Sequence, residues 1–219
     1  MLTRRGGRPV PAHYGSPAGE LAVCVAGVGL AERSDLAVIS IAAGERGLDQ
    51  LLVRVLGHEI APGGAVLDGG VWWCRAASGI ELLAICPGAR AQSLKVMLHR
   101  DVGRLVGGTL TDLSDARLVL NVVGRRTAEV LAELGVYGPD ANPRTTQPFT
   151  EVPVAGQPVS WLLEADTGAY AIVDASRSGE VWRAIEAAGR ASGITCVGIE
   201  AVERYALTER VRRRAASLS

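Results

Sequence analysis

Few side chains in this sequence have both the type and the spacing that metal binding or nucleophilic catalysis requires. The cysteines Cys24, Cys74, Cys86 and Cys196 form no CxxC pair, and the three histidines are isolated from one another. Zinc sites place thiolate and imidazole ligands at short, paired spacings. The glycine-rich segment 103–108 lacks the lysine of a phosphate-binding loop. We therefore expect no metal site and neither nucleophilic nor ATP-dependent chemistry.

The composition is typical of a soluble globular protein. Hydrophobic residues make up 48% of the 219 residues and charged residues 21%, which is enough for a packed core. The 23 basic and 23 acidic side chains give a net charge of zero, so no global field would attract nucleic acid or an anionic membrane. No apolar run approaches the roughly 18 residues of a membrane span, and the start lacks the apolar region of a secretory signal. We expect a cytoplasmic protein with reduced thiols.

A weak internal repeat organises the chain. Segment 34–57 resembles segment 114–135, and Ser34 and Ser114, which begin them, lie 80 residues apart. Each segment has an apolar run of about six residues, then a glycine, then apolar residues at helical spacing. This pattern predicts a strand, a turn and a helix in each copy.

The second part of each copy also corresponds, at an offset of 89 residues. Trp72 aligns with Trp161, and Gly79 aligns with Gly168, between two strand-like runs where a positive φ suits a tight turn. Helices are expected after these hairpins, at about 89–100 and 179–191. Each half is thus predicted as β-α-β-β-α.

The predicted fold class is α+β, with two pseudo-repeated halves and mostly antiparallel sheets. We place the halves at residues 1–107 and 108–219, the second ending in a C-terminal helix, and expect them to form one unit. Residues 137–158 are rich in Pro, Gly, Asn and Thr, which predicts a long loop. That loop is either a surface connection or a cover over a cleft.

Three segments carry a resemblance to a known family, namely Val10–Ile41, Leu110–Leu134 and Val197–Glu209. In order and spacing they resemble the folate-binding domain of the glycine-cleavage T-protein, an aminomethyltransferase. The shortened hairpins are more similar to the related gamma subunit of heterotetrameric sarcosine oxidase. The resemblance implies a T-protein-like domain without the family's C-terminal barrel. It also implies a pocket for tetrahydrofolate between the halves, where a carboxylate assists one-carbon transfer.

The chain departs from the T-protein where that chemistry would take place. The paired Asp-Asp of T-proteins aligns with Gly69 and Gly70, so the resemblance leaves Asp68 as the candidate catalytic carboxylate. The alternative is that Asp68 and the glycines only shape a turn. The pocket Asn of T-proteins aligns with Cys86, whose thiol is a poor substitute for an amide. The hairpin loop that supplies a folate-binding Glu is missing before Gly168.

The remaining candidates for ligand binding are aromatic or charged. The resemblance places Tyr14 beside the pocket, and it expects an arginine close to Arg204. Trp73 and Trp161 lie on equivalent strands and either stack on a ligand or fill the core. Glu164 either binds the ligand or is a solvated surface charge.

Two hypotheses follow. The first is a small-molecule-binding protein that holds tetrahydrofolate or a similar flat polar ligand in a central cavity, with one-carbon transfer or a repurposed reaction. The second is a non-catalytic subunit that packs against a flavoprotein partner or associates with itself. A nucleic-acid or membrane partner is expected in neither case.

Overall fold

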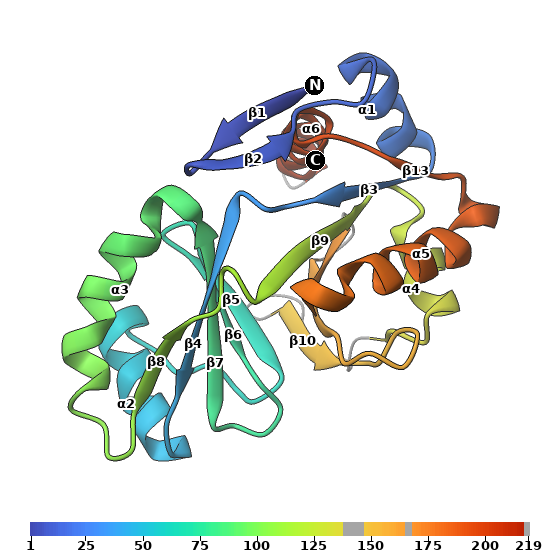
Figure 1. Cartoon of the computed structure of the whole chain (residues 1–219). Helices are drawn as coiled ribbons and strands as arrows, with labels where there is room; N and C mark the ends of the chain where they lie inside the picture. The colour runs from blue at the N-terminus through green and yellow to red at the C-terminus, as the bar shows by residue number, and fades with distance from the viewer. Residues whose placement is uncertain (138–146, 165–167, 217–219) are drawn as a thin grey trace.

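The computed structural model describes residues 1–137, 147–164 and 168–216. Two α+β halves lie side by side, and helices cover the outer face of each (Figure 1). Among the described residues, one continuous sheet of eleven strands runs through both halves, in the order β13-β3-β9-β12-β11-β10-β5-β6-β7-β4-β8. All of its pairs are antiparallel except β13 with β3. The predicted α+β class is confirmed.

The repeat is visible as two matching runs of elements. The first run is β4 (Leu36–Ala42), α2 (Glu45–Leu56), β5 (Gly64–Asp68), β6 (Val71–Arg75), β7 (Glu81–Pro87) and α3 (Gly88–Val102). The second run is β9 (Arg117–Val123), α4 (Thr127–Glu133), β10 (Gln147–Glu151), β11 (Ser160–Glu164), β12 (Gly168–Asp174) and α5 (Ser178–Ala188). Each half is therefore β-α-β-β-β-α, with one more strand than predicted.

Within the two repeated runs, the strands that the sequence pattern missed are β5 and β10. Strand β10 lies within residues 137–158, which were predicted to form a loop, so that prediction is wrong for 147–151. Of the other residues in this stretch, 138–146 lie outside the described part of the chain. Strand β10 pairs with β5, with Gln147 opposite Ala65, and thereby joins the sheets of the two halves.

The halves also exchange a strand. Strand β3 (Val28–Glu32) directly precedes β4 but pairs with β9 of the second half, and β8 (Thr109–Asp112) directly precedes β9 but pairs with β4 of the first half. Two equivalent hydrogen bonds mark the crossing, because Arg33 N–H donates to Val119 O at 2.9 Å and Leu113 N–H donates to Val38 O at 2.8 Å. Separating the halves would break both ladders.

Each half buries an outer core between its sheet and its two helices. In the first outer core, Leu48, Leu51 and Leu52 of α2 have the spacing of one helix face. They pack on the sheet together with Ile39, Ile41, Trp73, Leu82, Ala84, Leu94 and Leu98. The second outer core contains Leu30, Leu120, Val122, Val130, Trp161, Ala171, Val181 and Ile185. Helices predicted at 89–100 and 179–191 are observed as α3 and α5, with the second ending three residues early.

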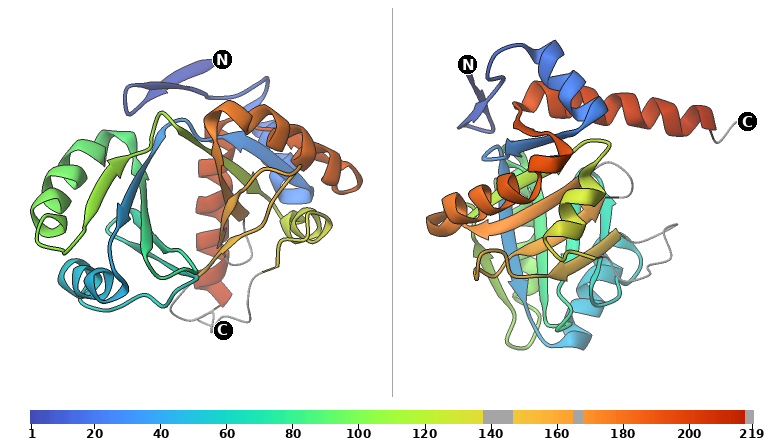
Figure 2. Two further views of the ribbon diagram at one scale, coloured as in Figure 1. Left: turned by 60° about the horizontal axis from the view of Figure 1, so that its bottom comes forward. Right: turned by 90° about the vertical axis from the view of Figure 1, so that its right-hand side faces the viewer.

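A third layer lies across one end of both halves (Figure 2). It consists of the hairpin β1 (Leu2–Arg5) and β2 (Arg8–Pro11), α1 (Pro17–Ala26) and α6 (Ile199–Ala216), which follows the edge strand β13 (Ile194–Cys196) of the sheet. The buried carboxylate of Glu20 connects α1 to the segments before α1 and before α6. It accepts hydrogen bonds from the backbone N–H groups of Tyr14, Gly15 and Gly198 at 2.7, 3.0 and 2.8 Å. No helix of the described residues has the length and apolar character of a membrane span.

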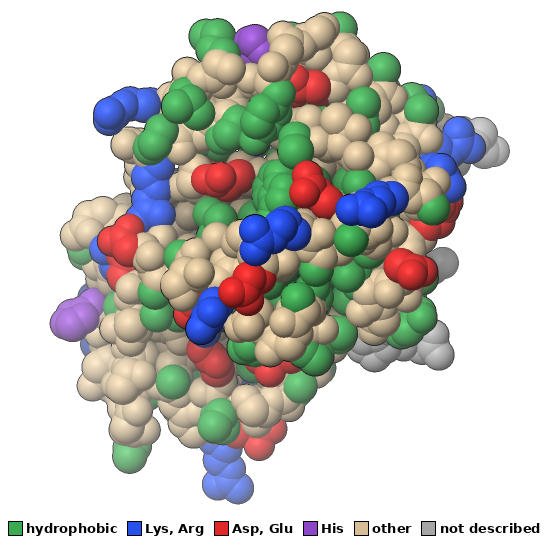
Figure 3. All heavy atoms as spheres, turned by 45° about the vertical axis from the view of Figure 1, so that its right-hand side comes forward, with side chains coloured by type: hydrophobic (Ala, Val, Ile, Leu, Met, Phe, Trp, Pro, Cys, Tyr) green, Lys and Arg blue, Asp and Glu red, His purple; other side chains and the backbone are tan. Residues whose placement is uncertain are grey.

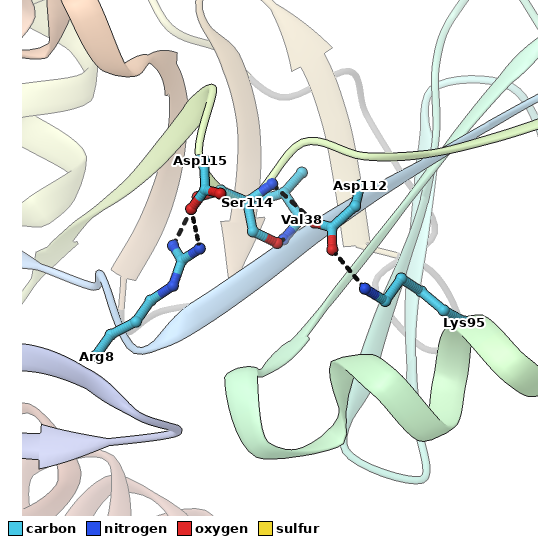
Figure 4. A network of polar contacts seen from close by, with 6 residues as sticks. All are labelled: Arg8, Val38, Lys95, Asp112, Ser114 and Asp115. Atoms are coloured by element: carbon cyan, nitrogen blue, oxygen red, sulfur yellow. Dashed lines mark hydrogen bonds and ion pairs between the residues drawn. The ribbon is translucent and has the colours of Figure 1, made fainter.

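A polar network lies where the chain segments 28–42 (β3 and β4) and 109–123 (β8 and β9) cross from one half to the other (Figure 4). Lys95 Nζ donates to Asp112 Oδ2 at 2.8 Å, and Ser114 N–H donates to Asp112 Oδ1 at 3.0 Å. The Ser114 hydroxyl in turn accepts from Val38 N–H at 3.1 Å. Burial alone would raise the pKa of Asp112, but the bonds from Lys95 and Ser114 lower this pKa to about 2. The Asp112 carboxylate therefore links helix α3 to strand β8.

We predict that Asp112→Asn lowers stability at neutral pH and that this loss disappears as the pH falls through 2. The pKa in the folded protein lies below the value of about 3.9 for an unfolded chain, so the stabilisation is complete above that value and is lost as the pH falls toward 2. The loss at pH 7 should stay below about 1 kcal/mol, because the pair is partly exposed. Urea unfolding across this pH range measures it, with Asp115→Asn as the control. A pH-independent loss would contradict the assignment.

Candidate functional site

The two halves meet through equivalent positions of the repeat, on the sheet faces that point away from the helices. Strand registers match five pairs of residues across this contact. The pairs are Val38 with Val119, Ala65 with Phe149, Cys74 with Leu162, Leu83 with Tyr170, and Ile85 with Ile172. We call these ten residues the central core. All are buried except Tyr170, which is partly buried.

Little space remains in this contact, although it is where the family resemblance places tetrahydrofolate. A cavity of about 70 Å³ lies beside the central core, and Glu81, Arg117, Phe149 and Ser160 are among the residues that line it. Pockets for small organic ligands usually have about 300 to 1,000 Å³. The observed cavity is therefore smaller than this range, and tetrahydrofolate binding remains a prediction.

Two equivalent polar side chains near this cavity, Ser40 and Asn121, form hydrogen bonds to neighbouring strands, whereas the buried Oδ1 of Asn121 has no partner among the described residues. The hydroxyl of Ser40 donates to Glu81 Oε1 at 2.8 Å, so this carboxylate is held by the neighbouring strand. Asn121 is the equivalent of Ser40 in the second half, and its Nδ2 donates to Ala169 O at 3.1 Å. A side chain on Gly168 would meet Val122 O at 2.9 Å, so the close approach of β12 to β9 requires glycine there.

A second polar cluster lies at the turn between β3 and β4. Arg33 forms a two-pronged ion pair with Asp35, from Nε to Oδ1 at 2.8 Å and from Nη2 to Oδ2 at 2.9 Å. Burial raises the pKa of the Tyr170 phenol and the charge of Glu164 raises it further, whereas the hydrogen bond from Arg33 opposes the shift. The Asp35 carboxylate balances the positive charge of the Arg33 guanidinium. The raised pKa keeps the Tyr170 phenol protonated at neutral pH. This cluster holds strands together and offers no free base.

Asp68 and Trp73 are the two predicted site residues that the structure brings together. They line one cavity of about 270 Å³ between the β5–β6 hairpin, α2 and α3. This cavity lies on the helix side of the first sheet, because Trp73 belongs to the first outer core. It is therefore separate from the contact between the halves, where the ligand was expected.

The glycines that align with the Asp pair of T-proteins form the turn of this hairpin. Gly69 and Gly70 have φ values of +53° and +76°, the left-handed conformation that side chains disfavour. Arg90 donates a hydrogen bond to the Gly69 carbonyl from α3. The interpretation of Asp68 and the glycines as a turn agrees with this geometry. Gly79 also has a positive φ, as predicted, but Gly168 does not: it is the first residue of β12, and 165–167 lie outside the described residues.

Trp161 and Cys86 are buried in different cores. Trp161 is fully buried in the second outer core, and its Nε1 donates to Val152 O at 3.3 Å. The registers make it the equivalent of Trp73, since Trp73 is paired with Ala84 and Trp161 with Ala171. The alignment of Trp161 with Trp72 was one residue out, which reverses the side-chain direction on a strand. Cys86 is buried in the first outer core, where burial raises its pKa.

The other three candidates are scattered. Tyr14 is 54% exposed in the end layer, and Arg204 is exposed on α6, 4.0 Å from Glu200. Glu164 lines a pocket of about 410 Å³ with Arg125 and Thr127, outside the contact between the halves. The roles predicted for all seven residues remain predictions. In the described part of the chain, no three His, Cys, Asp or Glu residues lie close enough to hold a metal ion.

Sequence reasoning missed the best-formed polar cluster of the protein. Arg33 is contributed by the turn between β3 and β4, whereas its partner Tyr170 comes from β12, more than a hundred residues later. Asp35 was visible as a repeated residue, matched by Asp115. Only the strand exchange, which no local pattern reports, brings Arg33 to the second half.

The sequence matches no known protein-family profile and no curated protein at a significant level. Among solved structures, the chain is similar to aminomethyltransferase T of the glycine cleavage system from Bartonella henselae, with a TM-score of 0.71 and 16% identity over 92% of this chain and 56% of that chain. It is also similar to a chain of heterotetrameric sarcosine oxidase from Corynebacterium sp. U-96, with a TM-score of 0.61 and 22% identity over 82% of this chain and 93% of that chain. The protein therefore has the predicted T-protein-like fold, and it spans little more than half the length of the aminomethyltransferase.

We predict that Phe149→Ala strongly destabilises the protein. The ring is 2% exposed in the central core, so its removal leaves a cavity that should cost about 3 to 5 kcal/mol in unfolding free energy. Thr150→Ala, whose side chain points to the opposite face of the same strand, is the matched control and should cost less than about 1 kcal/mol. Chemical denaturation measures both variants. Equal losses would show that the halves are not held by this contact.

Proposed function

We propose that this protein is a non-catalytic accessory subunit that uses a folate-domain fold to bind a larger oxidoreductase of the flavoprotein class. The observation that carries the proposal is the closed contact between the halves. Apolar side chains from both halves fill it, and the cavity beside them has about 70 Å³. Because one fold can carry different functions, a packed contact between the halves is compatible with a role in protein binding.

The likeness to a sarcosine oxidase chain supports this proposal. That chain belongs to a heterotetrameric enzyme, and the similarity extends over nearly all of it. The similarity to the aminomethyltransferase, in contrast, extends over about half of that chain. An accessory subunit needs the fold and a docking surface, whereas a transferase also needs a substrate site.

The residues near the central cavity argue against one-carbon transfer by the family mechanism. The position of the Asp pair is a glycine turn with two positive φ values, and Asp68 faces a different cavity. Glu81, a carboxylate that lines the central cavity, is bound by Ser40. Binding of tetrahydrofolate in the contact between the halves would require the halves to move apart. The strand pairs β3–β9 and β4–β8, which join the halves, oppose such a movement.

One face of the molecule carries interspersed charges of both signs. Acidic and basic side chains lie next to one another across the face in Figure 3, so that face has no field of a single sign. Large apolar side chains are exposed on several elements, including Val96 and Met97 of α3 and Leu207 and Val211 of α6.

The proposal predicts that the protein purifies from its native cells as part of a complex. At its natural expression level it should elute well above its 22.9 kDa monomer mass, together with a polypeptide that carries flavin absorbance. Gel filtration with light scattering and mass spectrometry identifies the partner, and recombination of the two purified proteins should restore the complex. Elution as a monomer from the native extract, with no flavoprotein in its fractions, would contradict the proposal.

A further inference from the structure

The cavity beside the β5–β6 hairpin has the features of a binding site, and we call it the hairpin groove. Its lining includes Asp68, Val71, Trp73, Arg90, Leu94 and Met97, and its volume is about 270 Å³. It opens between the hairpin and helices α2 and α3, on the helix side of the first sheet. It therefore shares no volume with the contact between the halves.

The floor of the hairpin groove is apolar and held in place by the first outer core. Val71, Trp73 and Leu94 are 3%, 2% and 7% exposed, so these side chains have little freedom to move. Met97 is 47% exposed and adds a flexible thioether at one side. A rigid floor with one adaptable wall suits the apolar body of a small ligand.

The rim carries two opposite charges that do not neutralise each other. Arg90 donates to the carbonyl of Gly69, which fixes the guanidinium over the hairpin turn, and it forms no ion pair with any described residue. Asp68 is exposed at the end of β5 and likewise has no ion-pair partner among the described residues. Free rim charges of both signs above an apolar floor can bind a ligand that carries both signs itself.

We propose that the hairpin groove binds a small zwitterion with an apolar body, the chemistry of an apolar α-amino acid. The ligand's carboxylate would pair with Arg90, its ammonium group with Asp68, and its side chain would lie on Trp73. The Ser93 hydroxyl donates to Arg90 O at 2.9 Å, so its oxygen can also accept from the ammonium group. The volume lies just below the range of about 300 to 1,000 Å³ for larger ligands, which limits the size of the ligand.

The test is a titration with L-leucine, followed by amide chemical shifts in a two-dimensional NMR spectrum of the full chain. The amides of Gly69, Gly70 and Ser93 should shift and saturate together. Isocaproate, which lacks the ammonium group, and isoamylamine, which lacks the carboxylate, should each bind at least about tenfold more weakly. No saturable shift at these amides, or equal binding of either analogue, would overturn the proposal.

Two variants assign the charges. Arg90→Gln keeps a donor for Gly69 O but should make leucine bind no better than isoamylamine, and Asp68→Asn should make it bind no better than isocaproate. Arg100→Gln, on the exposed face of the same helix, is the matched control and should bind leucine like the unmodified chain. If Arg90→Gln does not fold, Asp68→Asn decides alone. Unchanged binding in Asp68→Asn would refute the role of the rim charges.

Discussion

The rest of the structure depends on the antiparallel pairing of two long stretches of chain, 28–42 and 109–123. Each stretch begins in one half and ends in the other, so β3 completes the sheet of the second half and β8 that of the first. The backbone bonds of Arg33 and Leu113 at the crossing are equivalent by the repeat. This exchange forces the helix-free faces of both sheets against each other. The apolar central core is the consequence, since those faces would otherwise expose Val, Ile and Leu to water.

The proposal of a non-catalytic role rests on this closed contact. Equivalent positions of the two halves carry apolar residues. Val38 corresponds to Val119, and the small Ala65 of the first half corresponds to the larger Phe149 of the second. The repeat also places polar side chains at equivalent positions, as with Ser40 and Asn121, and Ser40 donates to Glu81. One of the cavities away from this contact lies on the outer side of the first sheet, beside the β5–β6 hairpin.

The sequence predicted much of the fold and little of the site. The repeated Ser–Asp pairs and the apolar periodicity located both strand–turn–helix segments, because these signals are local. Strand β10 was missed because its sequence, QPFTE, is short, starts beside a proline and lies in a stretch rich in turn-forming residues. The one-residue error at Trp161 has a physical origin, since two adjacent tryptophans at 72 and 73 offer two registers of opposite facing. The pairing of Arg33 with Tyr170 depends on the strand exchange, which has no local signature.

The proposed function rests on the packing between the halves, which is argued to exclude a folate from their contact. Calorimetric titration of the purified chain with tetrahydrofolate tests this claim most directly, with folic acid as the control. The packed contact predicts no saturable heat at any accessible concentration. Saturable binding near micromolar affinity, roughly −8 kcal/mol, would contradict the account, because the ligand would then have to open the central core or occupy a site that the contact was argued to close.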